Sequence, residues 1–212
     1  MTDARIISIA EAAVDELDKM CHESKSLWRA ERCGVPEATI WSKPGSKVRI
    51  FQAEAILAAP PSIVFDVLHV NVANVAQTRE WNTSVNECSL VKKLAPNVEV
   101  MLTQTFAMYG GLVSARDFVN VRMSKELPDG GYIVGTTGIE YEGIPIKAGV
   151  TRGMNGVMGF LILPHDQGTR LIWIINTDVK GWILRSLIDA AIPAEMESYI
   201  LALRKHVATL QA

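Results

Sequence analysis

The sequence predicts an α+β fold in which one curved antiparallel sheet grips a long C-terminal helix. Strand-length apolar segments follow one another through the chain, and turn residues separate them. Only one helical segment lies between strands, whereas parallel βαβ units would need a helix at every crossover. Roughly nine strands in one sheet must twist and curl, which leaves a concave side for the apolar face of the last helix.

The C-terminal helix has the clearest pattern. Across residues 184–210, apolar residues recur at steps of three and four, the spacing of one helix face at ~3.6 residues per turn. They are Leu184, Leu187, Ile188, Ala191, Ile192, Met196, Tyr199, Ile200, Leu203, Val207 and Leu210. Pro193 lies inside this stripe. A proline there removes one backbone hydrogen bond and collides with the preceding turn, so we expect a kink or break near residues 191–192.

The N-terminal part of the chain predicts a helix followed by a three-stranded meander. Residues 4–24 have helical apolar spacing, with Asp3 as the N-cap. Pro60 and Pro61 open a second helix, and residues 71–78 lack a regular pattern. Strands are expected at 28–33, 38–41, 47–58, 85–94, 98–109, 117–124, 132–137, 154–163 and 170–177.

Composition indicates one globular domain over residues 1–212, because 49% of the residues are hydrophobic and 21% are charged. The net charge of −2 gives no electrostatic reason to expect a nucleic-acid partner. No apolar stretch reaches bilayer length, and the N-terminus lacks the apolar core of a presequence, so we expect a cytoplasmic protein. The widely spaced Cys21, Cys33 and Cys88 fit reduced thiols and have no metal-binding spacing.

Four motifs occur in order: Arg-Glu-Trp-Asn at 79–82, Arg-Asp-Phe-Val-Asn-Val-Arg at 116–122, Pro-x-Lys-x-Gly-Val-x-Arg-Gly at 145–153 and Thr-Asp-Val-Lys-Gly-Trp at 177–182. Together they resemble the START domain, the lipid-transfer fold related to the steroidogenic acute regulatory protein. The resemblance covers residues 5–210 and is closest to the sterol-binding branch and its small soluble relatives. It implies the helix-grip fold, a curved nine-stranded antiparallel sheet that holds a lipid under the C-terminal helix.

The resemblance also implies a function. We expect a monomeric carrier that binds one hydrophobic lipid, a sterol such as cholesterol or a similar isoprenoid, and moves it between membranes through transient contact with them. No catalytic residue, cofactor or metal is expected. Sterol, bile acid, carotenoid and long-chain lipid all remain open as the ligand.

Alternation along the strand at 117–124 places Phe118, Asn120 and Arg122 on one side of the sheet. From the residues alone, a solvent-facing side is favoured, because arginine is rarely buried. The resemblance implies instead that Arg122 projects into the lipid cavity, where the sterol-binding branch pairs this arginine with an acid on the preceding strand.

Residues 101–109 of that preceding strand contain Thr103 and Thr105 but no acid. We therefore expect neutral groups or water to satisfy the Arg122 guanidinium. The helix is expected to supply the other wall of the cavity, and in the family the aromatic residue at the position of Tyr199 faces the ligand. Ordinary core packing is the alternative for these helix residues. They are Leu187, Met196, Tyr199, Ile200 and Leu203.

Residues 109–115 form a loop in which Gly110 and Gly111 precede two apolar residues, Leu112 and Val113. The resemblance implies the omega loop of the family, a lid over the cavity mouth, whereas the plain alternative is a simple connection. Together with Pro193, we expect this loop to act as a gate that opens at a membrane surface.

Two other functions remain open: an enzyme such as a cyclase or hydrolase that uses the same cavity on a hydrophobic substrate, and a lipid-sensing module that acts through a protein partner. An enzyme would need titratable groups gathered inside the cavity. The sequence contains no nucleophile elbow and no zinc-type histidine pair. Its four histidines are scattered, at His22, His69, His165 and His206.

Overall fold

The computed structural model describes residues 1–82, 84–107 and 113–211. Within these ranges the chain forms four α-helices, one 3₁₀ helix and twelve strands, which confirms the α+β class. The helices are α1 (Asp3–His22), η1 (Lys25–Leu27), α2 (Pro61–Leu68), α3 (Val75–Trp81) and α4 (Arg185–Thr209). The strands are β1 (Arg29–Ala30), β2 (Ala38–Pro44), β3 (Arg49–Leu57), β4 (Glu87–Ala95), β5 (Val98–Gln104), β6 (Arg116–Glu126), β7 (Tyr132–Gly138), β8 (Thr151–Arg152), β9 (Met154–Asn155), β10 (Met158–His165), β11 (Gly168–Ile175) and β12 (Thr177–Asp178).

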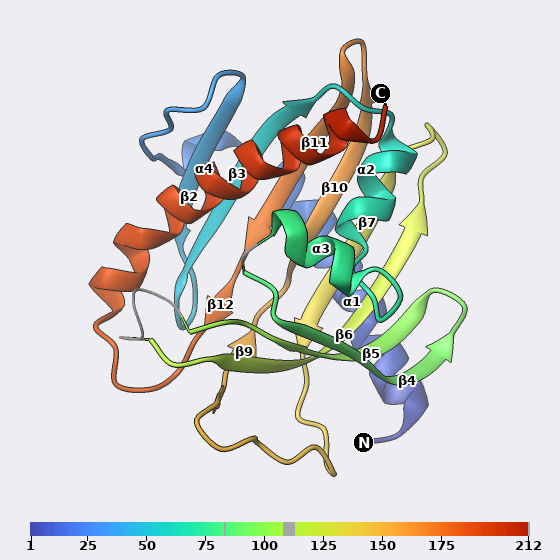
Figure 1. Ribbon diagram of the computed structural model, residues 1–212, viewed down its shortest axis with the longest axis vertical. Helices are drawn as coiled ribbons and strands as arrows, with labels where there is room; N and C mark the ends of the chain where they lie inside the picture. Colours follow the sequence, from blue (N-terminus) through green and yellow to red (C-terminus); the bar gives the residue numbers. More distant parts are fainter. Residues whose placement is uncertain (83, 108–112, 212) are drawn as a thin grey trace.

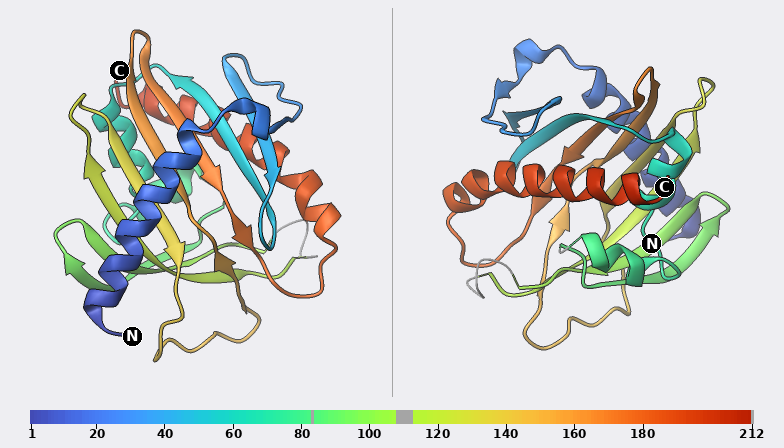
Figure 2. Two further views of the ribbon diagram at one scale, coloured as in Figure 1. Left: turned by 180° about the vertical axis from the view of Figure 1, so that it is seen from behind. Right: turned by 45° about the horizontal axis from the view of Figure 1, so that its top comes forward.

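Nine of these strands form one curved antiparallel sheet, as predicted. In the described part of the chain its hydrogen-bonded order is β1-β2-β3-β11-β10-β7-β6-β5-β4. β8 adds a short parallel partner to β6, and β9 pairs with β12 in a separate two-stranded sheet. α4 crosses one face of the sheet, with α2 and α3 on the same side (Figure 1), whereas α1 runs along the opposite face (Figure 2).

Alternation along β6 sends its side chains to these two faces. Val119, Val121 and Met123 join the core that includes Val14 and Leu17 of α1. α1 forms this core because its apolar residues return to one side at helical spacing. Its buried residues are Ile6, Ala10, Ala13, Val14, Leu17, Met20 and Cys21.

The other face of the sheet packs against the second half of α4. Met196 and Ile200 share a core with Phe51 of β3 and Trp173 of β11. A neighbouring core joins α4 to α2 and to strands β3, β10 and β11. Each fully buried aliphatic side chain in these cores stabilises the fold by roughly 1.5–3 kcal/mol, so the helix is held mainly by apolar contact.

The N-terminus of α1 differs from the prediction, because Thr2 and not Asp3 is the N-cap. Thr2 has extended backbone angles (φ −79°, ψ 153°), and its Oγ1 accepts a hydrogen bond from the Arg5 backbone N at 3.4 Å. Asp3 lies in the first turn, where its carboxylate interacts favourably with the positive end of the helix. It also forms an ion pair with Lys92, at 2.8 Å.

Helix α3 was missed, since the sequence predicted irregular structure over residues 71–78. Just before the helix begins, the Asn71 backbone N donates to Asn74 Oδ1 at 2.7 Å, and the Ala73 backbone N donates to Asn71 Oδ1 at 2.8 Å. These side-chain bonds form the turn from which the helix starts. The helix has only seven residues, too few for a helical apolar period to be recognised.

Helix α4 continues through Pro193, so the break considered near residues 191–192 does not occur. The proline removes one backbone hydrogen bond but leaves helical structure on both sides. The predicted apolar stripe is buried only beyond the proline, at Met196, Ile200, Leu203 and Val207. Before it, the side chains of Leu184 and Leu187 are 70% and 62% exposed.

Close contact between α1 and the sheet depends on Gly135 of β7. A Cβ atom on this glycine would lie 2.9 Å from the backbone N and Cα of Val14. Gly135→Ala is therefore expected to displace α1 and to lower the free energy of unfolding by about 1–3 kcal/mol, as measured by urea denaturation. Gly34→Ala is the matched control, because the nearest described atom, a Glu197 carboxylate oxygen, would lie 3.7 Å from the new Cβ. Equal losses in the two variants would contradict this packing argument.

Candidate functional site

Three aromatic side chains meet where α4 crosses the sheet. The ring centroid of Tyr199 lies 4.5 Å from that of Trp173 on β11 and 5.3 Å from that of Trp81 at the end of α3. Trp81 in turn stacks on His206, with the centroids 5.4 Å apart. Trp81 was not among the predicted site residues. Its only signal in the sequence was its place in the motif at 79–82.

Tyr199 combines partial exposure with strong desolvation. Its side chain keeps some accessible surface, but burial raises the pKa of its hydroxyl above the usual range. Tyr199 is therefore surrounded by protein although part of its surface remains accessible. The neighbouring helix residues Met196, Ile200 and Leu203 are fully buried. The structure therefore brings four of the five predicted helix residues together against the sheet.

The fifth predicted helix residue, Leu187, is not buried with them. It lies in the exposed first half of α4, with 62% of its surface accessible.

Of the two predicted threonines, Thr103 lies opposite Phe118 in the β5–β6 register. Thr105 lies beyond the end of β5, where its Oγ1 accepts a hydrogen bond from the Arg116 backbone N at 3.1 Å. Thr105 therefore has a structural partner.

On β6, Phe118 and Asn120 are both buried. The Phe118 ring covers Gly153, where an added Cβ would lie 2.2 Å from the ring. Asn120 Oδ1 accepts a hydrogen bond from Asn155 Nδ2 at 3.0 Å. This bond links β6 to β9 and fixes the orientation of two buried amides.

Arg122 lies on the same face of β6, and it does have an acidic partner. Its Nη2 donates to Glu99 Oε2 at 2.7 Å, and its Nη1 donates to the Val70 carbonyl O at 2.6 Å. The prediction that the preceding strand offers no acid was wrong. Glu99 stands directly opposite Arg122 in the antiparallel register. It was missed because the acid was sought only from residue 101 onward, whereas β5 begins at residue 98.

The Arg122–Glu99 pair is largely withdrawn from solvent, with 12% and 17% of the two side chains exposed. One donor is left over, because the Arg122 Nε–H is buried and has no partner among the described residues. A buried donor without a partner costs roughly 1–3 kcal/mol. An oxygen atom of a bound molecule could satisfy it.

The surroundings of Arg122 keep a nearby histidine neutral. Burial, and then the positive charge of Arg122, lower the pKa of His69 from 6.5 to about 4. The His69 ring stacks on Phe65 of α2, with the centroids 5.1 Å apart. Burial also raises the pKa of the Cys88 thiol, so that this cysteine stays protonated. The charged groups beside Arg122 are thus Glu99 and Lys93, which lies opposite Glu99 in the β4–β5 register.

Three of the four sequence motifs meet at the start of β6. Asp117 is 2% exposed, and its carboxylate accepts two hydrogen bonds from Arg152, at 2.7 and 2.9 Å. Arg116 donates to the carbonyls of Val179 and Lys180, at 3.0 and 3.2 Å. The motifs at 116–122, 145–153 and 177–182 are therefore joined by the guanidinium groups of the buried Arg116 and the partly buried Arg152.

Most residues of the predicted gate lie outside the part of the chain that the structure describes. Gly110, Gly111 and Leu112 lie outside the described residues. Val113 is buried, at 4% exposure, and Pro193 lies within α4.

Among the described residues, no three His, Cys, Asp or Glu side chains are grouped so that they could hold a metal ion. No described helix is both long and apolar enough to cross a bilayer.

Comparison with known proteins agrees with this geometry. The START domain family model matches residues 8–212. The chain belongs to the START family. The resemblance inferred from the four motifs is thereby confirmed, and so is the helix-grip fold.

Curated relatives of this START domain share about a quarter of its residues. The steroidogenic acute regulatory protein of Xenopus laevis is 28% identical over 162 residues, which cover 75% of this chain and 55% of that protein. The StAR-related lipid transfer protein 5 of Mus musculus is 27% identical over 187 residues and 86% of each chain. The START domain thus spans between half and two thirds of the steroidogenic acute regulatory proteins, here 55% in Xenopus laevis and 66% in Danio rerio.

Among solved structures, human StAR-related lipid transfer protein 5 superimposes with a TM-score of 0.91 over the whole of both chains, at 21% identity. Human STARD10 gives a TM-score of 0.77 at 15% identity and covers 93% of this START domain and 81% of that chain. At these identities the likeness establishes the fold.

The low pKa of His69 makes stability depend on pH. Between pH 6.5 and about 4 the unfolded chain binds a proton at this histidine and the native protein does not, so the free energy of unfolding falls as the pH is lowered through that window. His69→Phe is expected to remove this part of the decline while keeping an aromatic ring against Phe65. Urea midpoints at several pH values from 7 to 4 measure it, with the exposed His22→Gln as control. A decline in His69→Phe as steep as in the wild type would contradict the prediction.

Proposed function

We propose that this START domain binds one hydrophobic lipid, a sterol such as cholesterol or a similarly rigid isoprenoid, and carries it between membranes as a cytosolic monomer. The lipid lies between the concave face of the sheet and α4. The observation that carries the proposal is the buried Nε–H of Arg122, which has no partner among the described residues on a face otherwise rich in apolar and aromatic side chains. Such a face suits a ligand with a large apolar body and one polar end. The names of the relatives, which include StAR-related lipid transfer protein 5, support the same class of function.

The polar end of the ligand is recognised by two charges. A sterol hydroxyl accepts a hydrogen bond from the Arg122 Nε–H and donates its own proton to Glu99, which is 2.7 Å from the guanidinium. The rest of the ligand contacts apolar and aromatic side chains, with the amide of Asn120 and the hydroxyl of Thr103 beside them. The proposed contacts are Phe118 on β6 and Met196, Tyr199, Ile200 and Leu203 on α4.

Affinity does not limit such a carrier. Burying roughly 400–500 Å² of apolar ligand surface at ~25 cal/mol/Å² gives ~10–12 kcal/mol before the costs of association. The slow step is then release of the lipid, which requires part of the enclosing structure to move.

The first half of α4, residues 185–192, is the segment that supports a gate. It contains no buried residue, whereas the buried residues of the helix, from Met196 to Val207, all follow Pro193. Few apolar contacts oppose its movement, and Pro193 removes a backbone hydrogen bond at the boundary between the two halves. In the proposed gate this segment moves together with the loop at residues 109–115 while the second half of the helix stays in the core.

The polar anchor is tested with the double variant Arg122→Met/Glu99→Met. Removing both charges avoids leaving one of them buried and unpaired, so the fold is expected to tolerate the change. Affinity for a hydroxylated sterol should fall by about 10- to 100-fold, the equivalent of about 1.5–3 kcal/mol for hydrogen bonds to charged groups. Affinity for the same ring system without its hydroxyl should not fall. Both are measured by titration of the purified protein with fluorescent sterols.

The control for this experiment is Lys147→Met/Glu87→Met, which removes an ion pair of 2.6 Å whose side chains are about half exposed. It should bind both sterols as the wild type does. Equal losses for the two ligands in the Arg122/Glu99 variant would refute the anchor. Mass spectrometry of the lipid that copurifies with the native protein tests the ligand class, and recovery of a chemically altered lipid would favour an enzyme instead.

Replacing Pro193 tests the gate. Pro193→Ala restores one backbone N–H and a residue of high helix propensity, so the first half of α4 should open less often. We expect vesicle-to-vesicle lipid transfer to slow several-fold and hydrogen exchange at residues 185–192 to slow with it, while equilibrium affinity does not weaken. Glu195→Ala, an exposed change in the same helix, is the control. Unchanged transfer combined with slower exchange would place the gate elsewhere.

A further inference from the structure

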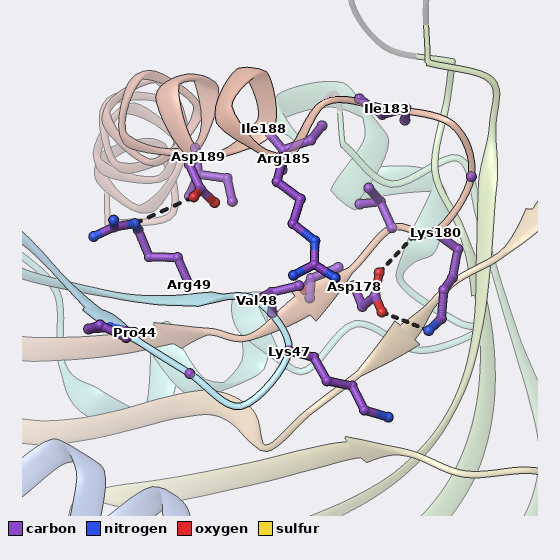
Figure 3. A pocket seen from close by; sticks show the side chains of 15 residues that line it. Pro44, Lys47, Val48, Arg49, Asp178, Lys180, Ile183, Arg185, Ile188 and Asp189 are labelled. Carbon is purple, nitrogen blue, oxygen red and sulfur yellow. Dashed lines mark hydrogen bonds and ion pairs between the residues drawn. The ribbon is translucent and has the colours of Figure 1, made fainter.

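A cavity of about 440 Å³ lies where the β2–β3 turn approaches the start of α4 (Figure 3). Four cationic and two acidic side chains line it, although the whole chain carries a net charge of −2. Two stretches of the chain supply them, residues 44–49 and 177–192. These residues are Lys47 and Arg49, Asp178 and Lys180, and Arg185 and Asp189.

Both carboxylates are already engaged. Asp178 lies 2.7 Å from the Lys180 Nζ. Burial opposes its ionisation, but the hydrogen bonds from Lys180 hold the pKa of Asp178 below its usual range. Asp189 lies 3.5 Å from Arg49 Nε. Among the described residues, neither Lys47 nor Arg185 is within ion-pair distance of a carboxylate, so the cavity keeps two uncompensated positive charges.

The start of α4 adds further donors. Figure 3 shows the Arg185 guanidinium pointing from the first turn into the cavity, towards Asp178, while Lys47 extends from the turn at the edge. The N-cap position is held by Leu184, whose side chain cannot cap the helix, and no side-chain cap bond is formed there. Free backbone N–H groups at a helix N-terminus favour an anion, phosphate above all.

Exposed apolar residues flank this cationic cavity. Trp182 is fully exposed, Leu184 is 70% exposed and Leu187 is 62% exposed. Water-facing side chains of this size, gathered within six residues of the chain, mark a contact surface. Tryptophan beside lysine and arginine is typical of the boundary between lipid headgroups and acyl chains.

The segment that carries Trp182 is braced from inside. Arg116, which is 3% exposed, donates to the carbonyls of Val179 and Lys180. Gly181 follows with a φ of +82°, and an added Cβ there would lie 3.0 Å from the Arg116 Nη2. The backbone before α4 is therefore held in place while its side chains point outward, as a docking surface requires.

We propose that this cavity binds the phosphate of an anionic phospholipid in a bilayer, while Trp182, Leu184 and Leu187 insert among the acyl chains beneath the headgroup. This inference rests on the proposed function, which requires contact with membranes. It adds the surface that makes the contact and the class of phospholipid that the surface binds. Of this surface, Arg185 and Leu187 belong to the half of α4 before Pro193, so membrane contact reaches the segment that has to move.

The test measures docking alone, with vesicles that contain no sterol. Wild-type protein should cosediment with vesicles of phosphatidylcholine containing about one third phosphatidylserine, and much less with pure phosphatidylcholine. Lys47→Gln/Arg185→Gln should weaken binding to the anionic vesicles by roughly 10- to 30-fold. Trp182→Ala should weaken binding to a similar extent. The charge-matched control is Arg5→Gln/Lys19→Gln, two exposed positions on α1 on the far side of the sheet, and it should bind as the wild type does.

Each variant is also checked for an unchanged urea midpoint and unchanged sterol affinity in solution. Wild-type binding to anionic vesicles by either cavity or Trp182 variant would overturn the inference. So would an equal loss in the α1 control, which would mean non-specific charge attraction. Tight binding of inorganic phosphate in solution, lost in the cavity variant without any loss of vesicle binding, would indicate a site for a soluble anion and overturn it too. If vesicles bind as expected but no sterol does, the docking surface stands and the proposed sterol carriage fails.

Discussion

The ion pair between the buried Asp117 and the partly buried Arg152 holds the end of the sheet from which the C-terminal helix departs. A carboxylate that is 2% exposed is tolerated only when a cation satisfies it, and Arg152 does so with two hydrogen bonds. The pair holds β8 beside the start of β6. The adjacent Arg116 binds the carbonyls of Val179 and Lys180, so the start of β6 fixes both β8 and the segment that leads into α4.

From that starting point, α4 behaves as two segments of one helix. Beyond Pro193 its apolar side chains are buried in two cores against the sheet and α2, which makes this half a fixed wall. Before Pro193 the same kind of side chain is exposed, as at Leu187. The apolar face of the helix therefore has a buried half, held by contact with the sheet and α2, and an exposed half beside the cationic cavity.

The concave face adds little charge to this arrangement. Arg122 and Glu99 neutralise each other, and burial keeps His69 neutral and Cys88 protonated near pH 7. A face with one compensated pair and one remaining donor can orient a ligand by a single polar group, while Tyr199 and the tryptophans around it contribute surface without charge. Such a site favours binding over acid–base chemistry, which needs a titratable group with a pKa near neutrality.

Local pattern alone determined the helices at the two ends of the chain, the strands of the sheet and the face of Phe118, Asn120 and Arg122. Period and alternation belong to short stretches of sequence, and the motifs added the family. Only the tertiary structure decided which acid meets Arg122, because the register of β5 against β6 brings Glu99 opposite it. It likewise decided that Leu187 is exposed while Met196 is buried, although both belong to one stripe, since burial depends on how far the sheet extends beneath the helix. Finally, the cationic cavity draws its side chains from residues 44–49 and from residues 177–192, two stretches distant in sequence, and no local pattern predicts that they meet.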